Sequence, residues 1–195
     1  MPTKKNRAIY QLKVVLQDID PPIWRRIQVW DDSTLSQLHR TLQIVMGWED
    51  YHLHEFLIGR LLYSVPDPDD KMYERKVIDE RRERLRDVVS QVGTPFVYAY
   101  DFGDDWRHDL LLEAILLPET DQQYPCCIAG ERRGPPEDVG GPPGYQDYLE
   151  AMADPKHEEH KDKLQWRGPW APEAFSLADV NKQLQKKSRT PRKPA

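Results

Sequence analysis

The change of hydrophobic period along the first half of this sequence constrains its fold most. Residues 9–17, IYQLKVVLQ, alternate apolar and polar side chains, which is the pattern of a strand with one buried face. IWRRIQVW follows after DIDPP, whose prolines fit a connection but not the interior of a ladder. The next segment, STLSQLHRTLQIVMGW, changes to helical spacing. We therefore expect a hairpin followed by a helix.

The expected helix carries its own start and stop signals. Thr34 and Gln37 occupy the positions of a capping box, and Gly47 lies just past the last apolar residue. The apolar positions share one helical face: Leu35, Leu38, Leu42 and Val45.

The rest of the chain is expected to add strands and then helices. We expect a strand from His54 to Tyr63, bent at Gly59, and then an exposed charged loop with a short strand at Lys76 to Asp79. LRDVVSQVG is expected to form a helical turn, and PFVYAYDFGDDWRHDLLLEAILL a second hairpin. YPCCIAGERRGPPEDVGGPPGY is too rich in Pro and Gly to predict regular structure. Helical segments are expected at about 145–153 and 177–185.

These elements predict an α+β fold: a mixed, mostly antiparallel sheet of hairpins, one main helix in a β-grasp-like order, and C-terminal helices. A length of 195 residues suits one domain, placed at 8–185. Residues 1–7 and 186–195 hold eight basic and no acidic residues, and are expected to be flexible tails. The body between them has 20 basic and 33 acidic residues, a formal charge of about −13. Such a body disfavours nucleic acid, which would have to bind the basic tails or a local basic patch.

The stretch YAYDFGDDWRHDL raises the question of a catalytic or metal centre. With a three-residue loop of Gly103, Asp104 and Asp105, Asp101 would oppose Arg107 and form a cross-strand ion pair. This interpretation makes the stretch a structural turn, in which Gly103 adopts a positive φ and Asp104 and Asp105 accept hydrogen bonds from nearby backbone amides.

The same register would place His108 opposite Tyr100, as a half-buried histidine bonded to a neighbour. His52 and His54 are two residues apart, which on a strand directs both imidazoles to one face. If His108 lies nearby, these three with Asp104 or Asp105 could hold a divalent metal ion.

The sequence lacks the signature motifs of several classes of protein. The chain has no G-x-x-x-x-G-K-[ST], no G-x-G-x-x-G and no G-x-S-x-G. No apolar run is long enough to span a membrane, and the N-terminus is not that of a secretory signal, so a cytoplasmic protein is expected. The adjacent Cys126 and Cys127 lack C-x-x-C spacing and are expected to be free thiols. No organic cofactor is indicated.

Five motifs in order give a more specific signal: PPIWRRIQV, HLHEF, YDFGDDWRH, GERRGPPEDVGG with GY, and WAPEAFSLADVN. Together they resemble the plasmid pRiA4b ORF-3-like family over about residues 8–185. The resemblance implies a compact α+β fold and an association with plasmids and insertion elements, whose passenger proteins are labelled resolvases. Relatives carry cysteines near PPED where this chain has Gly134 and Val139, so any metal here would rely on histidines and carboxylates.

Two hypotheses about function follow. The first is a non-enzymatic interaction or accessory module with an unknown protein partner, because aromatic residues accompany the motifs and no catalytic signature is present. The second is a metal-dependent hydrolase or nuclease that uses the His52, His54 and His108 site, with Glu55 as a base. A site-specific recombinase is not indicated, because the sequence shows no nucleophilic serine or tyrosine among arginines.

Overall fold

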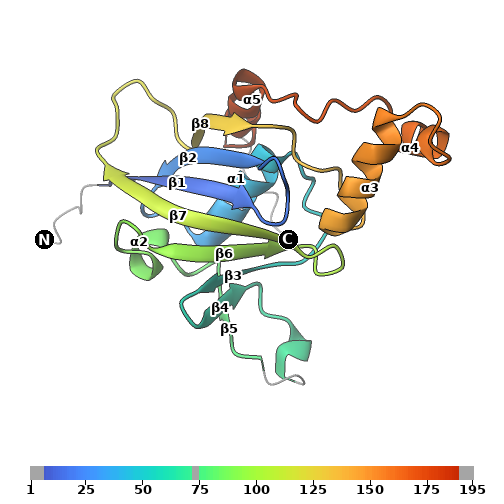
Figure 1. Ribbon diagram of the computed structural model, residues 1–195. Coiled ribbons are helices and arrows are strands. Elements are labelled where there is room, and N and C mark those ends of the chain that lie inside the picture. Colours follow the sequence, from blue (N-terminus) through green and yellow to red (C-terminus); the bar gives the residue numbers. More distant parts are fainter. Residues whose placement is uncertain (1–6, 72–74, 189–195) are drawn as a thin grey trace, which may run out of the picture.

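A computed structural model describes residues 7–71 and 75–188, which form one eight-stranded sheet with helices around it (Figure 1). The strands are β1 (Ile9–Leu16), β2 (Trp24–Trp30), β3 (His54–Ile58), β4 (Leu61–Ser64), β5 (Val77–Asp79), β6 (Pro95–Tyr100), β7 (Trp106–Leu116) and β8 (Cys126–Glu131). The helices are α1 (Leu35–Met46), α2 (Leu85–Val88), α3 (Gly141–Ala153), α4 (His160–Arg167) and α5 (Leu177–Ser188), with a 3-10 turn η1 (Pro68–Lys71).

The strands lie in the order β5-β4-β3-β6-β7-β1-β2-β8. Every neighbouring pair is antiparallel except β4 and β5, which are parallel. Helix α1 lies behind the sheet as drawn in Figure 1, while α3 and α4 extend from one end and α5 packs beside β8. The predicted α+β class, with its mostly antiparallel sheet, early helix and C-terminal helices, is confirmed.

Helix α1 forms as its sequence predicts. Thr34 accepts a hydrogen bond from the Gln37 amide, and the Gln37 side chain accepts one from the Thr34 amide, which completes the capping box. Gly47 ends the helix in the left-handed region at φ 88°. Leu35, Leu38 and Leu42 are fully buried and pack against the inner face of the sheet, where they form one core with residues of β1, β2, β6 and β7. This packing fixes the position of every polar side chain that α1 directs inward.

Three predicted elements differ in the structure. Residues 54–63 form a hairpin of β3 and β4 rather than one bent strand, because Gly59 adopts φ 62° and reverses the chain with Arg60. The segment expected to be irregular contains β8, which pairs with β2 between the proline-rich flanks. Helix α3 begins at Gly141 rather than near 145, because the first turn of a helix accommodates Pro142 and Pro143.

The two edges of the sheet are protected in different ways. Strand β5 is only three residues long, which limits pairing with another chain. At the other edge, the Asn181 side chain of α5 accepts a hydrogen bond from the Cys127 amide and donates one to the Cys127 carbonyl, at 2.8 Å each. Helix α5 therefore occupies part of the hydrogen-bonding edge of β8.

The basic tails predicted at 1–7 and 186–195 lie mostly outside the described residues. Of the residues that are described, Arg7 pairs with Asp32 at 2.7 Å and stacks over Trp30, and α5 continues to Ser188.

Candidate functional site

The hairpin of β6 and β7 has a longer loop than predicted. Tyr100 pairs with Trp106 and Tyr98 pairs with His108, so residues 101–105 form a five-residue loop. The predicted three-residue loop, with Tyr100 opposite His108, is therefore wrong by two residues. The five-residue loop forms because Asp101 and Asp105, at its two ends, adopt left-handed backbone conformations at φ 56° and 52°.

The predicted ion pair between Asp101 and Arg107 is also absent. Arg107 instead donates to Asp105 at 3.0 Å, on the exposed side of the hairpin. Asp101 uses Oδ1 to accept hydrogen bonds from the amides of Gly103 and Asp104, at 3.0 and 3.3 Å. The stretch is a turn, as expected, but its residues have other roles: Asp101 and Asp105, not Gly103, adopt the positive φ, and Asp101 caps the loop amides. This leaves the second oxygen of Asp101 for another partner.

His108 is fully buried and apart from the other two predicted histidines. Its Nδ1 lies 3.3 Å from the Tyr98 carbonyl, and its ring packs edge-on against Trp48. Burial lowers the pKa of His108 to about 4, so the imidazole is neutral near pH 7. The predicted site of His52, His54 and His108 does not form, because each histidine enters a different environment.

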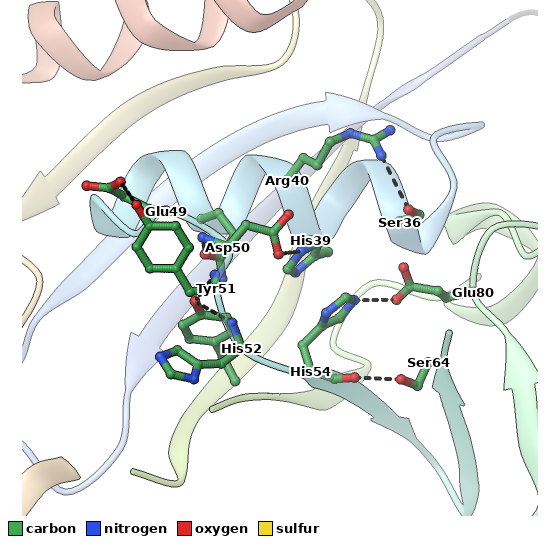
Figure 2. A network of polar contacts seen from close by, with 12 residues as sticks. Ser36, His39, Arg40, Glu49, Asp50, Tyr51, His52, His54, Ser64 and Glu80 are labelled. Atoms are coloured by element: carbon green, nitrogen blue, oxygen red, sulfur yellow. Dashed lines mark hydrogen bonds and ion pairs between the residues drawn. The ribbon is translucent and has the colours of Figure 1, made fainter. Parts of the chain in front are cut away.

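The two histidines of the HLHEF motif separate as well. His54 begins β3 and points into the protein, while His52 lies in the preceding loop and its ring points away from His54 (Figure 2). The prediction that both imidazoles share one strand face is wrong, because the strand begins only at His54.

His54 belongs to an interior cluster of five residues, His39, Asp50, His54, Glu80 and Tyr98. The His39 and His54 rings stack with centroids 3.4 Å apart and an interplanar angle of 3°. His39 Nε2 lies 2.8 Å from Asp50, and His54 Nε2 lies 2.8 Å from the buried Glu80 (Figure 2). Two histidines and the Glu80 carboxylate thus meet between α1 and the sheet, and the half-exposed Asp50 closes the cluster on its solvent side.

The hydrogen bonds around Tyr98 assign the proton positions in the interior cluster. Gln43 accepts from the Asp50 amide with its oxygen, so its nitrogen donates to the Tyr98 hydroxyl at 2.9 Å. The hydroxyl must then donate to His39 Nδ1, which leaves Nε2–H to donate to Asp50. Burial raises the pKa of Tyr98 and lowers the pKa of His39, and both shifts favour this neutral arrangement.

The stacked rings bear on metal binding by the interior cluster. His39, Asp50 and His54 bring ligand atoms within 4.8 Å of one another. An imidazole lone pair lies in the plane of its ring, so two parallel rings direct their lone pairs along parallel planes and not toward one point. One ring would have to tilt before both could bind the same ion. As it stands, the interior cluster is a hydrogen-bonded network that a cavity of about 730 Å³ beside α1 reaches at Asp50.

A second group, the loop cluster, consists of His52, Asp101 and Asp138. His52 Nε2 lies 3.0 Å from Asp138 Oδ1 and 3.5 Å from Asp101 Oδ2. These three residues come from the loop before β3, the β6–β7 loop and the segment after β8. Their side chains range from 11% exposed for Asp101 to 60% for Asp138, so the cluster opens to solvent on one side.

The Tyr100 hydroxyl connects the loops that carry the residues of the loop cluster. It donates to Glu137 and accepts from the amides of Tyr51 and His52, at 3.0 and 3.4 Å. Burial, together with the Glu137 carboxylate, raises the pKa of Tyr100 and keeps the hydroxyl protonated. One phenol therefore connects a sheet strand to the two loops that carry His52 and Asp138.

The remaining predicted site residues lie outside both clusters. Asp104 accepts a hydrogen bond from the Gly140 amide at 3.0 Å, and Asp105 pairs with Arg107. Glu55, the predicted base, pairs with Arg75 at 2.6 Å. Asp104 nonetheless has a positioning effect, because it ties the hairpin tip to the segment that carries Asp138.

Sequence reasoning missed five residues of the two clusters: His39, Asp50, Glu80, Tyr98 and Asp138. Of these, His39 carried a usable signal, since it lies four residues after Leu35 and three before Leu42 and so shares their buried face. The other four reach their clusters only through tertiary contacts. Cys126 and Cys127 are free and buried, as expected, and belong to neither group. Burial raises the pKa of Cys126 to about 11, which makes it a poor ligand and nucleophile near neutral pH.

The fold and the clusters define a class: an α+β protein with a single sheet, one polar cluster between the sheet and α1, and a second where three loops meet. The chain belongs to the plasmid pRiA4b ORF-3-like protein family, whose model matches residues 8–179. In the described part of the chain, no helix is long and apolar enough to cross a membrane.

Two relatives support this assignment. Uncharacterized protein y4hQ of Sinorhizobium fredii is 40% identical over 162 residues, which cover 83% of this chain and 81% of the relative. The crystal structure of MM3350 from Methanosarcina mazei, a protein of unknown function, matches with a TM-score of 0.79 and 38% identity, over 90% of this chain and 99% of that one.

Proposed function

We propose that this protein is a non-enzymatic interaction or accessory module, which acts in the cytoplasm and is encoded with plasmids or insertion elements. One observation carries the proposal: Tyr51 and Leu53 are 69% and 70% exposed on a segment whose backbone is held in place. The Tyr51 amide donates to Tyr100, and the Leu53 carbonyl accepts from the Asp101 amide at 2.9 Å. Apolar side chains presented by an ordered backbone lose little entropy on binding, which favours their use as contact residues.

The family assignment and the electrostatics agree with this proposal. The family description, which refers to a plasmid, supports the proposed plasmid association, and the acidic body disfavours nucleic acid as the partner. The exposed side chains of Tyr51 and Leu53 therefore suit a protein partner with an apolar contact surface.

The test compares two double variants with the native chain. Tyr51→Ser with Leu53→Ser removes the contact pair, and Leu116→Ser with Leu117→Ser removes exposed apolar residues at the end of β7 as a control. Affinity capture from host lysate, followed by light scattering of the purified complex, should show a partner with the native chain and the control but not with the loop variant. Equal capture by all three, or neither a partner nor self-association with the native chain, would reject the proposal.

A metal-dependent hydrolase or nuclease is the second candidate, favoured by the meeting of histidines and carboxylates in two clusters. It requires metal-dependent turnover of a phosphate or carboxylate ester. Hydrolysis that disappears with EDTA and returns with a divalent metal would select this candidate over the interaction module.

A further inference from the structure

We infer that the loop cluster of His52, Asp101 and Asp138 is a binding site for one divalent cation of the first transition row. The inference does not rest on the proposed interaction role, because it requires neither Tyr51 nor Leu53 to contact a partner. It also differs from the three-histidine site predicted from the sequence, with which it shares only His52.

The first argument is the position of His52 Nε2. This atom is shielded from solvent and lies close to two carboxylates, yet it makes a hydrogen bond with neither. The nitrogen and the two carboxylate oxygens are therefore close together but not hydrogen-bonded. Three ligand atoms around one shared metal ion have the same arrangement.

The second argument is the spacing of the ligand atoms. Bonds of about 2.1 Å to nitrogen and oxygen place neighbouring ligands about 3.0 Å apart at an octahedral angle and about 3.4 Å apart at a tetrahedral angle. The observed separations from Nε2 are 3.0 and 3.5 Å, and all three ligand atoms lie within 4.8 Å of one another. The group needs little movement to accept an ion.

The third argument is that contacts other than the ion hold the ligands in place. Asp101 Oδ1 is fixed by two loop amides, which directs Oδ2 toward His52. Asp104 accepts from the Gly140 amide, and a Cβ on Gly141 would lie 2.3 Å from the Asp104 carbonyl. The hairpin tip and the segment after Asp138 therefore meet at a contact that only glycine permits. Ligands positioned in this way bind with a smaller ordering cost.

The fourth argument is the local charge. A cavity of about 260 Å³ beside the cluster is lined by Asp138, Glu159 and Asp162, with Lys163 as its one cation. This acidic surrounding attracts a cation to the open side of the site, where water can complete the coordination. One imidazole with two carboxylates suits Mn²⁺, Fe²⁺ or Zn²⁺ better than Mg²⁺ or Ca²⁺, which prefer oxygen ligands alone.

The bound ion would join three segments that are distant in sequence. His52 belongs to the YHLHEF stretch, Asp101 to YDFGDDWRH and Asp138 to GERRGPPEDVGG. We therefore expect the ion to stabilise the end of the molecule where these loops meet, in addition to any role in chemistry.

The test titrates Mn²⁺ into the full native chain, purified without a chelating tag and dialysed against EDTA, and counts free Mn²⁺ by electron paramagnetic resonance. Mn²⁺ is chosen because it avoids the thiols Cys126 and Cys127. We expect one saturable site per chain. Asp138→Asn should weaken binding by at least about tenfold, since even residues that only support metal ligands are commonly worth that much.

Two matched controls make the result specific. Asp105→Asn changes an exposed aspartate of the same hairpin tip, and Asp50→Asn changes the interior cluster, so both should bind Mn²⁺ as the native chain does. Asp138 is 60% exposed, so its substitution should leave the circular dichroism of the metal-free protein unchanged. The inference fails if Mn²⁺ binding is not saturable, if Asp138→Asn binds normally, or if Asp50→Asn alone abolishes binding.

Discussion

His108 shows how a single buried histidine couples stability to pH. Its ring is fully buried, its Nε2 has no hydrogen-bond partner, and burial lowers its pKa to about 4. In the unfolded chain the same group takes up a proton near pH 6.5. The unfolded state therefore binds more protons than the folded state between these two values, so stability falls as the pH falls from about 6.5 to about 4.

The prediction for His108 is a flatter pH profile after substitution by an apolar residue. Protonation of His108 in the unfolded chain should lower the free energy of unfolding by about 2 kcal/mol between pH 7 and pH 5. His108→Leu should lose about 2 kcal/mol less than the native chain between these two pH values, as measured by urea unfolding. The same loss in both proteins would show that His108 is not the titrating group.

Tyr98 is the residue on which the interior cluster most depends. Its hydroxyl connects His39 and Gln43, and in Tyr98→Phe both would lose a buried partner. We expect this variant to lose about 2 to 3 kcal/mol of unfolding free energy. Tyr148→Phe is the matched control, because the Tyr148 hydroxyl is buried without a partner and its removal should cost almost nothing. Equal losses in thermal or urea unfolding would contradict the assigned network.

At the scale of elements, the sequence predicts those helices, strands and turns that depend on neighbouring residues alone. The alternation in β1 and β2, the capping box of α1, and the hairpin of β6 and β7 all follow from periodicity and turn residues. Strand β8 was missed because it is a short edge strand with proline before it and glycine within it. Its hydrogen bonds go to β2 and to Asn181 of α5, and neither partner is visible locally.

The same distinction explains which parts of the site could be predicted. Unusual residue types point to His52 and to the β6–β7 loop, which carries its partner Asp101, but the nearer partner, Asp138, comes from the segment after β8. The two-residue error in the hairpin arose because Asp101 and Asp105 adopt positive φ values that sequence suggests more readily for Gly103. A loop register error of this size changes which residues face each other, and so it changed the predicted site.

At the scale of the whole molecule, Arg25 connects the early elements to the late ones. It is 1% exposed and donates to the carbonyl oxygens of four residues: Trp24, Val45, Glu131 and Arg132. Its guanidinium also lies 4.2 Å from the ring centroid of Phe175, in the segment before α5. Burial lowers the pKa of Arg25 to about 10, so it remains a cation at neutral pH. One side chain thus joins β2, the end of α1, β8 and the C-terminal segment.

Arg25→Lys tests whether this connection supports the whole fold. Lysine keeps the charge but has three donors on a compact ammonium, so it cannot reproduce the planar fork that reaches four carbonyls. We expect a loss of about 3 kcal/mol or more in urea unfolding, because buried acceptors and a buried charge are left poorly paired. Arg26→Lys, at the neighbouring position, changes a partly exposed pair with Glu113 and should cost about 1 kcal/mol or less.

Because Arg25 touches elements from both halves of the chain, its loss should lower the midpoint of one cooperative transition. A separate early transition of the C-terminal helices, with the sheet unaffected, would instead show that the two parts unfold independently.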